Sequence, residues 1–317
     1  MRALGALVLA FAAMTAHAAY PDRPIKLVVP FAPGGSADLV GRLLAQQLTE
    51  SLGQPVVVEN KGGASGMLGN EYVAKSPPDG YTLTVGTLGP FAVNQTLYEH
   101  VPYDNIRDFA PITLTGLSSH ILVANPSVPV TNVNELIALA KQKPGQLTFA
   151  SSGTGNATHL TFELFKARAG IDIVHVPYKG GGPAMADLVG GQVLFSFASM
   201  ASAVPFVRSG RLRAIAVSGA ERSALFPEVP TVAESGLPGF ASEDWQGILA
   251  PAKTPADIVQ KLNGEFGRIL LLPEVKAKLQ AAGFEPKPST PEWFGQFIQA
   301  ETVKWAKLLK GIGIKAQ

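Results

Sequence analysis

Short apolar runs alternate along the chain with segments whose apolar residues recur at helical spacing. Residues 25–29 form a run typical of a buried strand, and the loop 31–35 follows it. Beyond the loop, apolar residues recur at helical spacing at Leu39, Val40, Leu43, Leu44, Leu48 and Leu52, and Gly53 closes the helix. Strand runs at 55–59 and 81–86 continue the rhythm. This alternation predicts a largely parallel sheet with helices on both faces.

A second block with the same rhythm begins near Ile121. Strands are expected at residues 147–150, 173–176, 193–197 and 212–217. Helices are expected at residues 132–143 and 157–169. One more helix is expected to start at Pro183, because the first turn of a helix tolerates the missing N–H of proline.

The last part of the chain starts with an expected strand at 247–250. Residues 254–257 read Thr-Pro-Ala-Asp, which resembles a capping box that opens a helix. Two further helices are predicted near residues 273–282 and 291–309. The second block therefore has the pattern of an insertion between two parts of the first.

We predict an α/β fold in which the chain crosses between two domains twice, near residues 118–124 and 240–248. Residues 19–121 with 246–317 would form one domain, and residues 122–245 the inserted one. Each domain would be a mixed, mostly parallel sheet flanked by helices. Two crossings make a hinge, and the space between the domains makes a cleft.

The N-terminus has the pattern of a signal peptide. Met1-Arg2 gives a positive start, residues 4–13 are apolar, and Ala16-His17-Ala18 supplies the small-x-small cleavage pattern. The apolar run is short for a membrane anchor, which needs about 20 residues. We therefore predict cleavage after Ala18 and export to the periplasm.

Composition narrows the classes of function. A net charge of +2 and the lack of any basic block with interleaved aromatic residues argue against nucleic acid as a partner. The sequence contains no cysteine, so neither a disulfide nor a thiolate can contribute. A chain of about 300 residues after cleavage is long enough for two domains.

Candidate chemistry gathers at three strand-to-helix junctions that combine glycine with small polar residues: residues 33–36, 151–156 and 179–182. Residues 61–66 are similar in composition. A helix N-terminus has unpaired N–H groups and a partial positive charge, so it can bind a carboxylate or phosphate without a basic side chain. Such loops can also be plain tight turns, and Ser36 can be an N-cap only. Their recurrence at equivalent positions in two domains favours an anion site.

Other chemistries have little support in the sequence. It contains no P-loop, no nucleophile elbow, and no glycine-rich dinucleotide fingerprint after a strand, so we predict no catalytic residues and no cofactor. No pair among His100, His120, His159 and His175 has metal-ligand spacing, so no metal site is predicted. His159 could either donate to a ligand or satisfy the loop backbone. Asp38 is better placed to neutralise its helix dipole than to touch an anion.

Six segments together resemble one known family. They are residues 20–48, 59–69, 76–83, 151–160 and 176–185, and the stretch 237–251 with Leu-Pro-Gly-Phe and Trp245. In this order they resemble the Bug family, the substrate receptors of tripartite tricarboxylate transporters. The resemblance implies a two-domain periplasmic-binding-protein fold (type II-like) and a small carboxylate ligand. It also implies membrane permease subunits as partners, and we expect a monomer.

The junctions and the resemblance together give the candidate ligand-binding residues. They are Phe31, Pro33, Gly34, Gly35, Ser36, Asp38, Ser151, Ser152, Gly153, Thr154, Gly155, Thr158, His159, Tyr178, Lys179, Gly180 and Ala198. Many relatives carry an acid followed by asparagine after the strand near 193–197, where this chain has Ala198 and Ser199. The missing acid makes an amino-acid ligand less expected. Two alternatives remain open: a carboxylate receptor for a membrane sensor kinase, and an enzyme of similar α/β fold.

Overall fold

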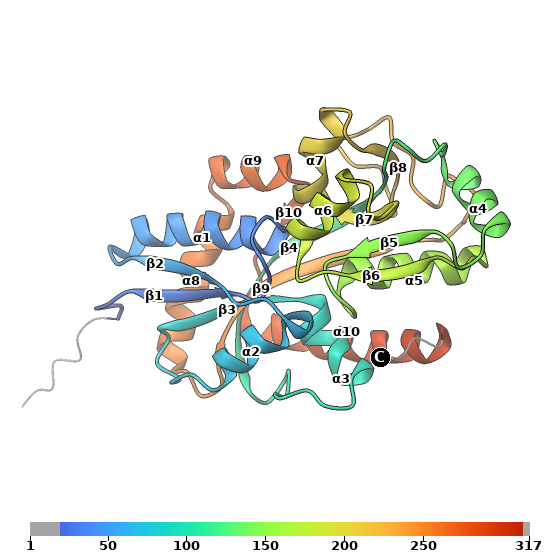
Figure 1. Cartoon of the computed structure of the whole chain (residues 1–317). Coiled ribbons are helices and arrows are strands. Elements are labelled where there is room, and N and C mark those ends of the chain that lie inside the picture. The colour runs from blue at the N-terminus through green and yellow to red at the C-terminus, as the bar shows by residue number, and fades with distance from the viewer. Residues whose placement is uncertain (1–19, 313–317) are drawn as a thin grey trace, which may run out of the picture.

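The structure is a computed structural model that describes residues 20–312. The predicted signal peptide, residues 1–18, lies outside the described residues. Within residues 20–312 no helix is both long and apolar enough to cross a membrane. The described chain folds into a mixed α/β arrangement around a long twisted sheet (Figure 1).

The first part of the sheet is parallel, as the sequence predicts. Strand β1 pairs with β2 on one side and with β3 on the other, both in parallel. The elements of this part are β1 (Ile25–Val29), α1 (Ser36–Leu52), β2 (Val56–Asn60), η1 (Ala64–Gly66), α2 (Met67–Ala74), β3 (Thr82–Thr87), η2 (Gly89–Val93) and α3 (Asn94–Leu97). Gly53 ends α1 in the left-handed conformation, with φ of 67°. That geometry suits glycine because it carries no Cβ.

Two antiparallel strands join the halves of the molecule. They are β4 (Phe109–Ala124) and β9 (Glu243–Pro251), which pair with each other from Phe109 to Ser119 of β4. From His120 onward β4 pairs instead with strands of the second half. The predicted crossing at 118–124 therefore lies within β4 and most of the one at 240–248 lies within β9, and the two are paired at Ser118 and Ser119.

The second half repeats the β-α rhythm. Strand β5 pairs in parallel with β6 and β7, while β7 and β8 pair antiparallel to β4. Its elements are α4 (Val133–Gln142), β5 (Thr148–Ser151), α5 (Ala157–Ala169), β6 (Val174–Pro177), α6 (Gly181–Val189), β7 (Phe195–Ser199), α7 (Met200–Arg208) and β8 (Arg213–Val217). Helix α6 begins two residues before the predicted start at Pro183, directly after Gly180.

The C-terminal part adds α8 (Ala256–Leu270), α9 (Pro273–Ala281), β10 (Phe284–Pro286) and α10 (Pro291–Ile312) to the first half. The helix predicted after residue 254 is present, but the predicted capping box is wrong. Pro255 is the N-cap residue of α8 and makes no side-chain cap. The hydroxyl of Thr254 instead donates to the carbonyl of Pro251 at 2.7 Å.

Helices cover both faces of each half. In the first half, residues of α1, α8 and α9 share one apolar cluster with β1 and β3, and residues of η2 and α10 share another. In the second half, α4 and α5 pack in one cluster and α6 and α7 in the other. Ala157 and Leu160 of α5 belong to a first-half cluster, so the two halves touch at the start of α5.

Candidate functional site

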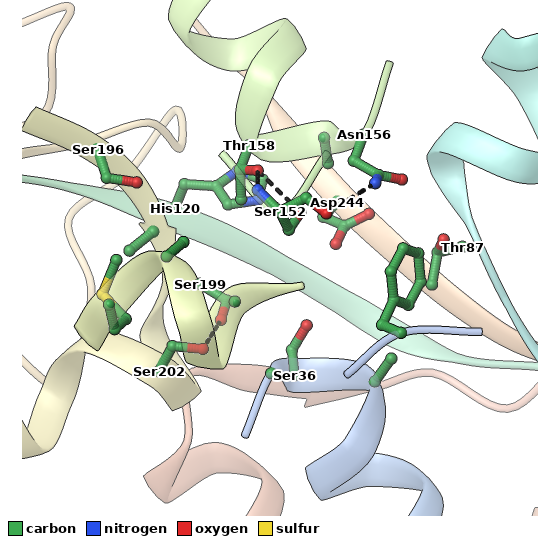
Figure 2. Close-up of a pocket in the computed structure, with 18 residues that line it drawn as sticks. Ser36, Thr87, His120, Ser152, Asn156, Thr158, Ser196, Ser199, Ser202 and Asp244 are labelled. Carbon is green, nitrogen blue, oxygen red and sulfur yellow. Dashed lines mark hydrogen bonds between the residues drawn. The ribbon is translucent and has the colours of Figure 1, made fainter. Parts of the chain in front are cut away.

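Four helices begin around one small cavity between the halves. Each follows a strand directly: α1 after β1, α5 after β5, α6 after β6 and α7 after β7. Figure 2 shows the eighteen residues that line the cavity: Phe31, Gly35, Ser36, Ala37, Thr87, His120, Ser152, Asn156, Ala157, Thr158, Gly181, Ala184, Met185, Ser196, Ala198, Ser199, Ser202 and Asp244. None of these described residues is a lysine or an arginine.

The loop before α1 is held by Asp38, whose side chain is buried. Its carboxylate accepts the N–H of Gly34 at 3.1 Å, the amide of Asn60 at 2.9 Å and the guanidinium of Arg42 at 3.0 Å. Burial by itself raises the pKa of Asp38, but these hydrogen bonds outweigh burial and the net effect is a lowered pKa. Asp38 does not line the cavity, so it fixes the loop and stays ionised.

Ser36 is the first residue of α1, and Gly35 is the N-cap residue. The amide of Gln246, on β9, donates to the Ser36 hydroxyl at 2.8 Å. The side chain of Ser36 thus faces the cavity (Figure 2) and does not cap its own helix. Its hydroxyl is positioned by a group from strand β9.

The loop before α5 is closed by its own polar side chains. Thr158 Oγ1 accepts the N–H of Ser152 at 2.9 Å and also lies 2.9 Å from Ser152 Oγ. The amide of Asn156 donates to the Ser152 carbonyl at 3.2 Å. These three residues line the cavity (Figure 2), so the hydrogen bonds that shape the loop also place its polar groups around the enclosed space.

His159 supports this loop from behind and does not line the cavity. Its Nδ1 accepts the N–H of Gly155 at 3.0 Å, and its ring stacks on His175 at 4.0 Å between centroids. Burial, with smaller contributions from His175 and Lys166, lowers the pKa of His159 far below its usual value. Of the two roles open to His159 in the sequence, the structure shows the backbone-satisfying one.

The loop before α6 packs against the loop before α1. The N–H of Ala32 donates to the Lys179 carbonyl at 2.9 Å. Gly182 comes so close that a Cβ there would lie 2.3 Å from the Pro33 carbonyl oxygen. The side chain of Lys179 is exposed. Loops that the sequence predicts as ligand contacts therefore also touch each other across the two halves.

A second, more open hollow of about 240 Å³ lies beside the cavity. Gly153, Thr154, Tyr178 and Lys179 line it, and Phe31 and Ser152 line both spaces. On its first-half side it is lined by Gly63, Ala64, Ser65, Gly66 and Tyr98. The fourth glycine-rich segment of the sequence thus faces this hollow and not the enclosed cavity.

Comparison with known proteins identifies the family. The family described as "TctC: Tripartite tricarboxylate transporter family receptor" matches residues 40–314. The chain belongs to this family. The resemblance to Bug proteins seen in the sequence is thereby confirmed, since Protein BugT of Bordetella pertussis is 41% identical over 297 residues, 93% of this chain and 91% of that protein.

Two solved structures are also close to this TctC receptor. The R. palustris protein Rpa4515 with adipate has a TM-score of 0.91 at 38% identity, covering 93% of this chain and 99% of that one. MatC (Rpa3494) from Rhodopseudomonas palustris with bound malate has a TM-score of 0.87 at 35% identity, covering 92% and 100%. The predicted fold class is therefore confirmed.

The sequence-predicted residues of the TctC receptor fall into three groups. Phe31, Gly35, Ser36, Ser152, Thr158 and Ala198 line the cavity. Gly153, Thr154, Tyr178 and Lys179 line only the neighbouring hollow. Pro33, Gly34, Asp38, Ser151, Gly155, His159 and Gly180 line neither; several of them shape the loops that do.

At one wall of the cavity the sequence predicted only Ala198 and missed the neighbouring serines. Ser199 is the last residue of β7 and the N-cap residue of α7, a fourth strand-to-helix junction without glycine, and its hydroxyl lies 2.8 Å from that of Ser202. The available signal was the predicted strand at 193–197 with serines after it, which resembles the other junctions in position but not in composition. Thr87, His120 and Asp244 come from strands β3, β4 and β9, whose pairing the local pattern does not reveal.

Proposed function

We propose that this TctC family receptor binds a small organic carboxylate in the cavity between its halves and delivers it, from the periplasm, to the membrane subunits of a tripartite tricarboxylate transporter. One observation carries the proposal: four helix N-termini converge on a cavity whose described lining has no lysine or arginine. The adipate and malate seen in Rpa4515 and MatC support the same class of ligand.

The charge of the cavity follows from its helices. Each helix N-terminus carries roughly half a positive charge and unpaired N–H groups. Hydroxyl groups of Ser36, Ser152, Thr158, Ser199 and Ser202 add donors at the same place (Figure 2). A carboxylate accepts such hydrogen bonds in two directions, whereas a neutral solute of similar size cannot use the helix charge.

The same lining favours binding without catalysis. Ser151 Oγ and His175 Nε2 lie 2.6 Å apart, the spacing of a serine nucleophile and its base. Neither residue lines the cavity, however, and Ser151 is fully buried. Within residues 20–312 no cluster of three acidic or histidine side chains could hold a metal ion. We therefore propose a receptor and not an enzyme of similar fold.

The first test identifies the ligand. The purified chain is screened by thermal shift against organic acids, with adipate and malate included, and the best acid is then titrated by calorimetry. A ligand present at about 100 times its Kd stabilises the fold by about 2.7 kcal/mol, which is easily detected. If no carboxylate in a broad panel shifts the melting temperature, the proposed function is wrong.

Replacing the bound carboxylate of that acid by a primary amide tests how it is held. Hydrogen bonds to a charged acceptor contribute about 1.5–3 kcal/mol each, and the amide NH₂ would face donors. We expect a loss of about 2–4 kcal/mol, which is roughly 30- to 1000-fold in Kd. Calorimetry with the acid and its amide measures the ratio. Equal affinities would show that the helix N-termini do not bind the carboxylate.

A further inference from the structure

The cavity contains polar groups that the helix N-termini do not account for. Thr87 and His120 are buried, and neither Thr87 Oγ1 nor His120 Nε2 has a hydrogen-bond partner within residues 20–312. Both residues line the cavity (Figure 2). Buried polar atoms are nearly always hydrogen-bonded, so two unpaired atoms in one cavity point to a second polar group on the ligand.

Asp244 also lines the cavity (Figure 2) and belongs to the strand β9 that crosses between the halves. Only 8% of the residue is exposed, and it accepts the N–H of Trp245 at 2.8 Å. Burial raises the pKa of Asp244 to about 7, with the N–H groups of Trp245 and Leu88 opposing the rise. Its carboxyl group can therefore hold or release a proton near neutral pH.

The raised pKa of Asp244 comes from burial and not from nearby charged side chains. His120 is the other titratable residue among the cavity lining, and burial lowers its pKa to about 4, so it is neutral at pH 7. On the outer side, Asp244 shares a groove with Arg168, Glu243, Glu301, Lys304 and Lys307. None of these charges is a cause of the shift at Asp244.

We propose that Asp244 recognises the second carboxylate of a dicarboxylate ligand, by donating its carboxyl O–H to that group. This inference rests on the proposed function, which already places one carboxylate at the helix N-termini. The donor O–H exists only in the protonated acid, and the proton comes from solvent when Asp244 is ionised before binding. His120 Nε2 and Thr87 Oγ1, which also line the cavity, would supply further hydrogen bonds to the ligand.

A dicarboxylate fits this cavity better than an amino acid. An ammonium group would pair with an ionised Asp244, but four helix N-termini with partial positive charge surround the same space and repel it. A second carboxylate is attracted by those helices. An ionised Asp244 would repel this second carboxylate. A buried Asp244 that keeps its proton is neutral and can donate a hydrogen bond to it.

The sign of the pH dependence follows from linkage. A ligand carboxylate beside Asp244 raises the pKa of that residue further, so the complex holds a proton that the free receptor loses above pH 7. Binding then takes up one proton above pH 7, and the Kd rises about tenfold per pH unit. Below pH 7 the free receptor is already protonated, and the Kd becomes independent of Asp244.

The experiment compares three probes of equal length: adipate, hexanoate and 6-aminohexanoate. Calorimetry from pH 6 to pH 9, in buffers of different ionisation enthalpy, measures both Kd and the number of protons taken up. For the wild type we expect adipate to bind most tightly and to take up one proton above pH 7, while hexanoate takes up none. This measurement needs no variant.

Asp244→Asn keeps a donor and removes the titration. We expect it to bind adipate without proton uptake and without the tenfold change per pH unit, whereas Asp244→Leu should lose the preference for adipate over hexanoate. Glu243→Gln is the matched control, because this neighbouring acid is exposed and does not line the cavity. It should behave as the wild type.

Three results would overturn the inference while leaving the proposed function intact. These are a preference for hexanoate or 6-aminohexanoate over adipate, adipate binding that takes up no proton at pH 8, and binding that strengthens above pH 7. A receptor that binds no carboxylate at any pH would instead overturn the proposed function itself.

Discussion

Gly35 lines the cavity and carries no side chain, whereas Lys179 is charged but lies outside the cavity. Gly35 has φ of −93° and ψ of 175°, a conformation open to any residue, so glycine is not required there by the backbone. A Cβ on Gly35 would lie 3.5 Å from the backbone nitrogen of Gly181, on the other half. Lys179 carries a charge, but its side chain is exposed and lines only the outer hollow.

We therefore expect Gly35→Val to abolish ligand binding, because the branched side chain occupies the cavity between two helix N-termini. Its melting temperature without ligand should change little. Lys179→Met should change Kd much less, since an exposed charge contributes about 0–1 kcal/mol. Calorimetry with the acid from the screen measures both. The reverse ranking would mean that a lysine side chain, and not backbone N–H groups, holds the anion.

The surroundings of Asp38 can be predicted from the sequence, whereas those of Asp244 cannot. The pairing of Asp38 with Arg42 is visible in the sequence as an i, i+4 spacing, and its place in the first turn of α1 follows from the helical pattern. The environment of Asp244 depends on strands β3, β4 and β9 coming together around it. The missing acid at Ala198 makes an amino-acid ligand less expected, but the sequence pattern does not reveal that Asp244 brings a carboxyl group to the cavity from another strand.

At the scale of elements, apolar periodicity predicted the helices and strands that carry the junctions. Helix α5 has the predicted bounds, and β1 does as well. The first part of β4 was not predicted, since Pro111, Gly116 and Ser118 interrupt its apolar pattern. Pairing with β9 and β10 stabilises this segment, and both partners are more than 120 residues away in sequence.

The close approach of two loops gives a test at this scale. Helix α6 can reach the loop before α1 because Gly182 has no Cβ to meet the Pro33 carbonyl. We expect Gly182→Ala to push the loops apart at a cost of about 1–3 kcal/mol in the closed form. Ligand binding should weaken roughly 5- to 150-fold.

Gly264→Ala is the matched control, because it adds the same methyl group to helix α8 where nothing lies within 4 Å. It should leave the Kd unchanged and stabilise the fold by about 0.5–1 kcal/mol, the helix preference of alanine over glycine. Calorimetry and chemical unfolding of both variants make the comparison. An unchanged Kd in Gly182→Ala would show that the contact between α6 and Pro33 is not part of the bound state.

At the scale of the whole molecule, hydrogen bonds link the two halves around the cavity. The N–H of Ala32 bonds to Lys179, the hydroxyl of Ser202 donates to the Gly34 carbonyl at 3.2 Å, and that of Tyr98 donates to the Thr154 carbonyl at 3.0 Å. We interpret this arrangement as the closed form. The proposed division into domains at 121/122 and 245/246 falls close to the point where β4 changes partners.

Closure predicts a change of size in solution. The domains are expected to move as rigid bodies about β4 and β9, so small-angle scattering should give a smaller radius of gyration with saturating acid than without it. Around the cavity, the described loops of the two halves are linked by individual hydrogen bonds and not by paired strands, which allows the empty receptor to open. A hinged receptor would be contradicted by one result: scattering curves that are identical with and without acid, at a radius of gyration larger than that of the closed form.

The paired crossings also set the mechanics of that motion. Ser118 and Ser119 of β4 lie opposite Asp244 and Glu243 of β9, and Ser118 also pairs with Phe284 of β10, so the proposed hinge is part of the sheet and not a pair of separate loops. Adjacent strands of a sheet can twist relative to each other over a range of angles while they keep their hydrogen bonds. We therefore expect the halves to move relative to each other mainly by twisting about this strand pair. A transporter that docks across both halves would meet two sharply different outlines, one for a loaded receptor and one for an empty one.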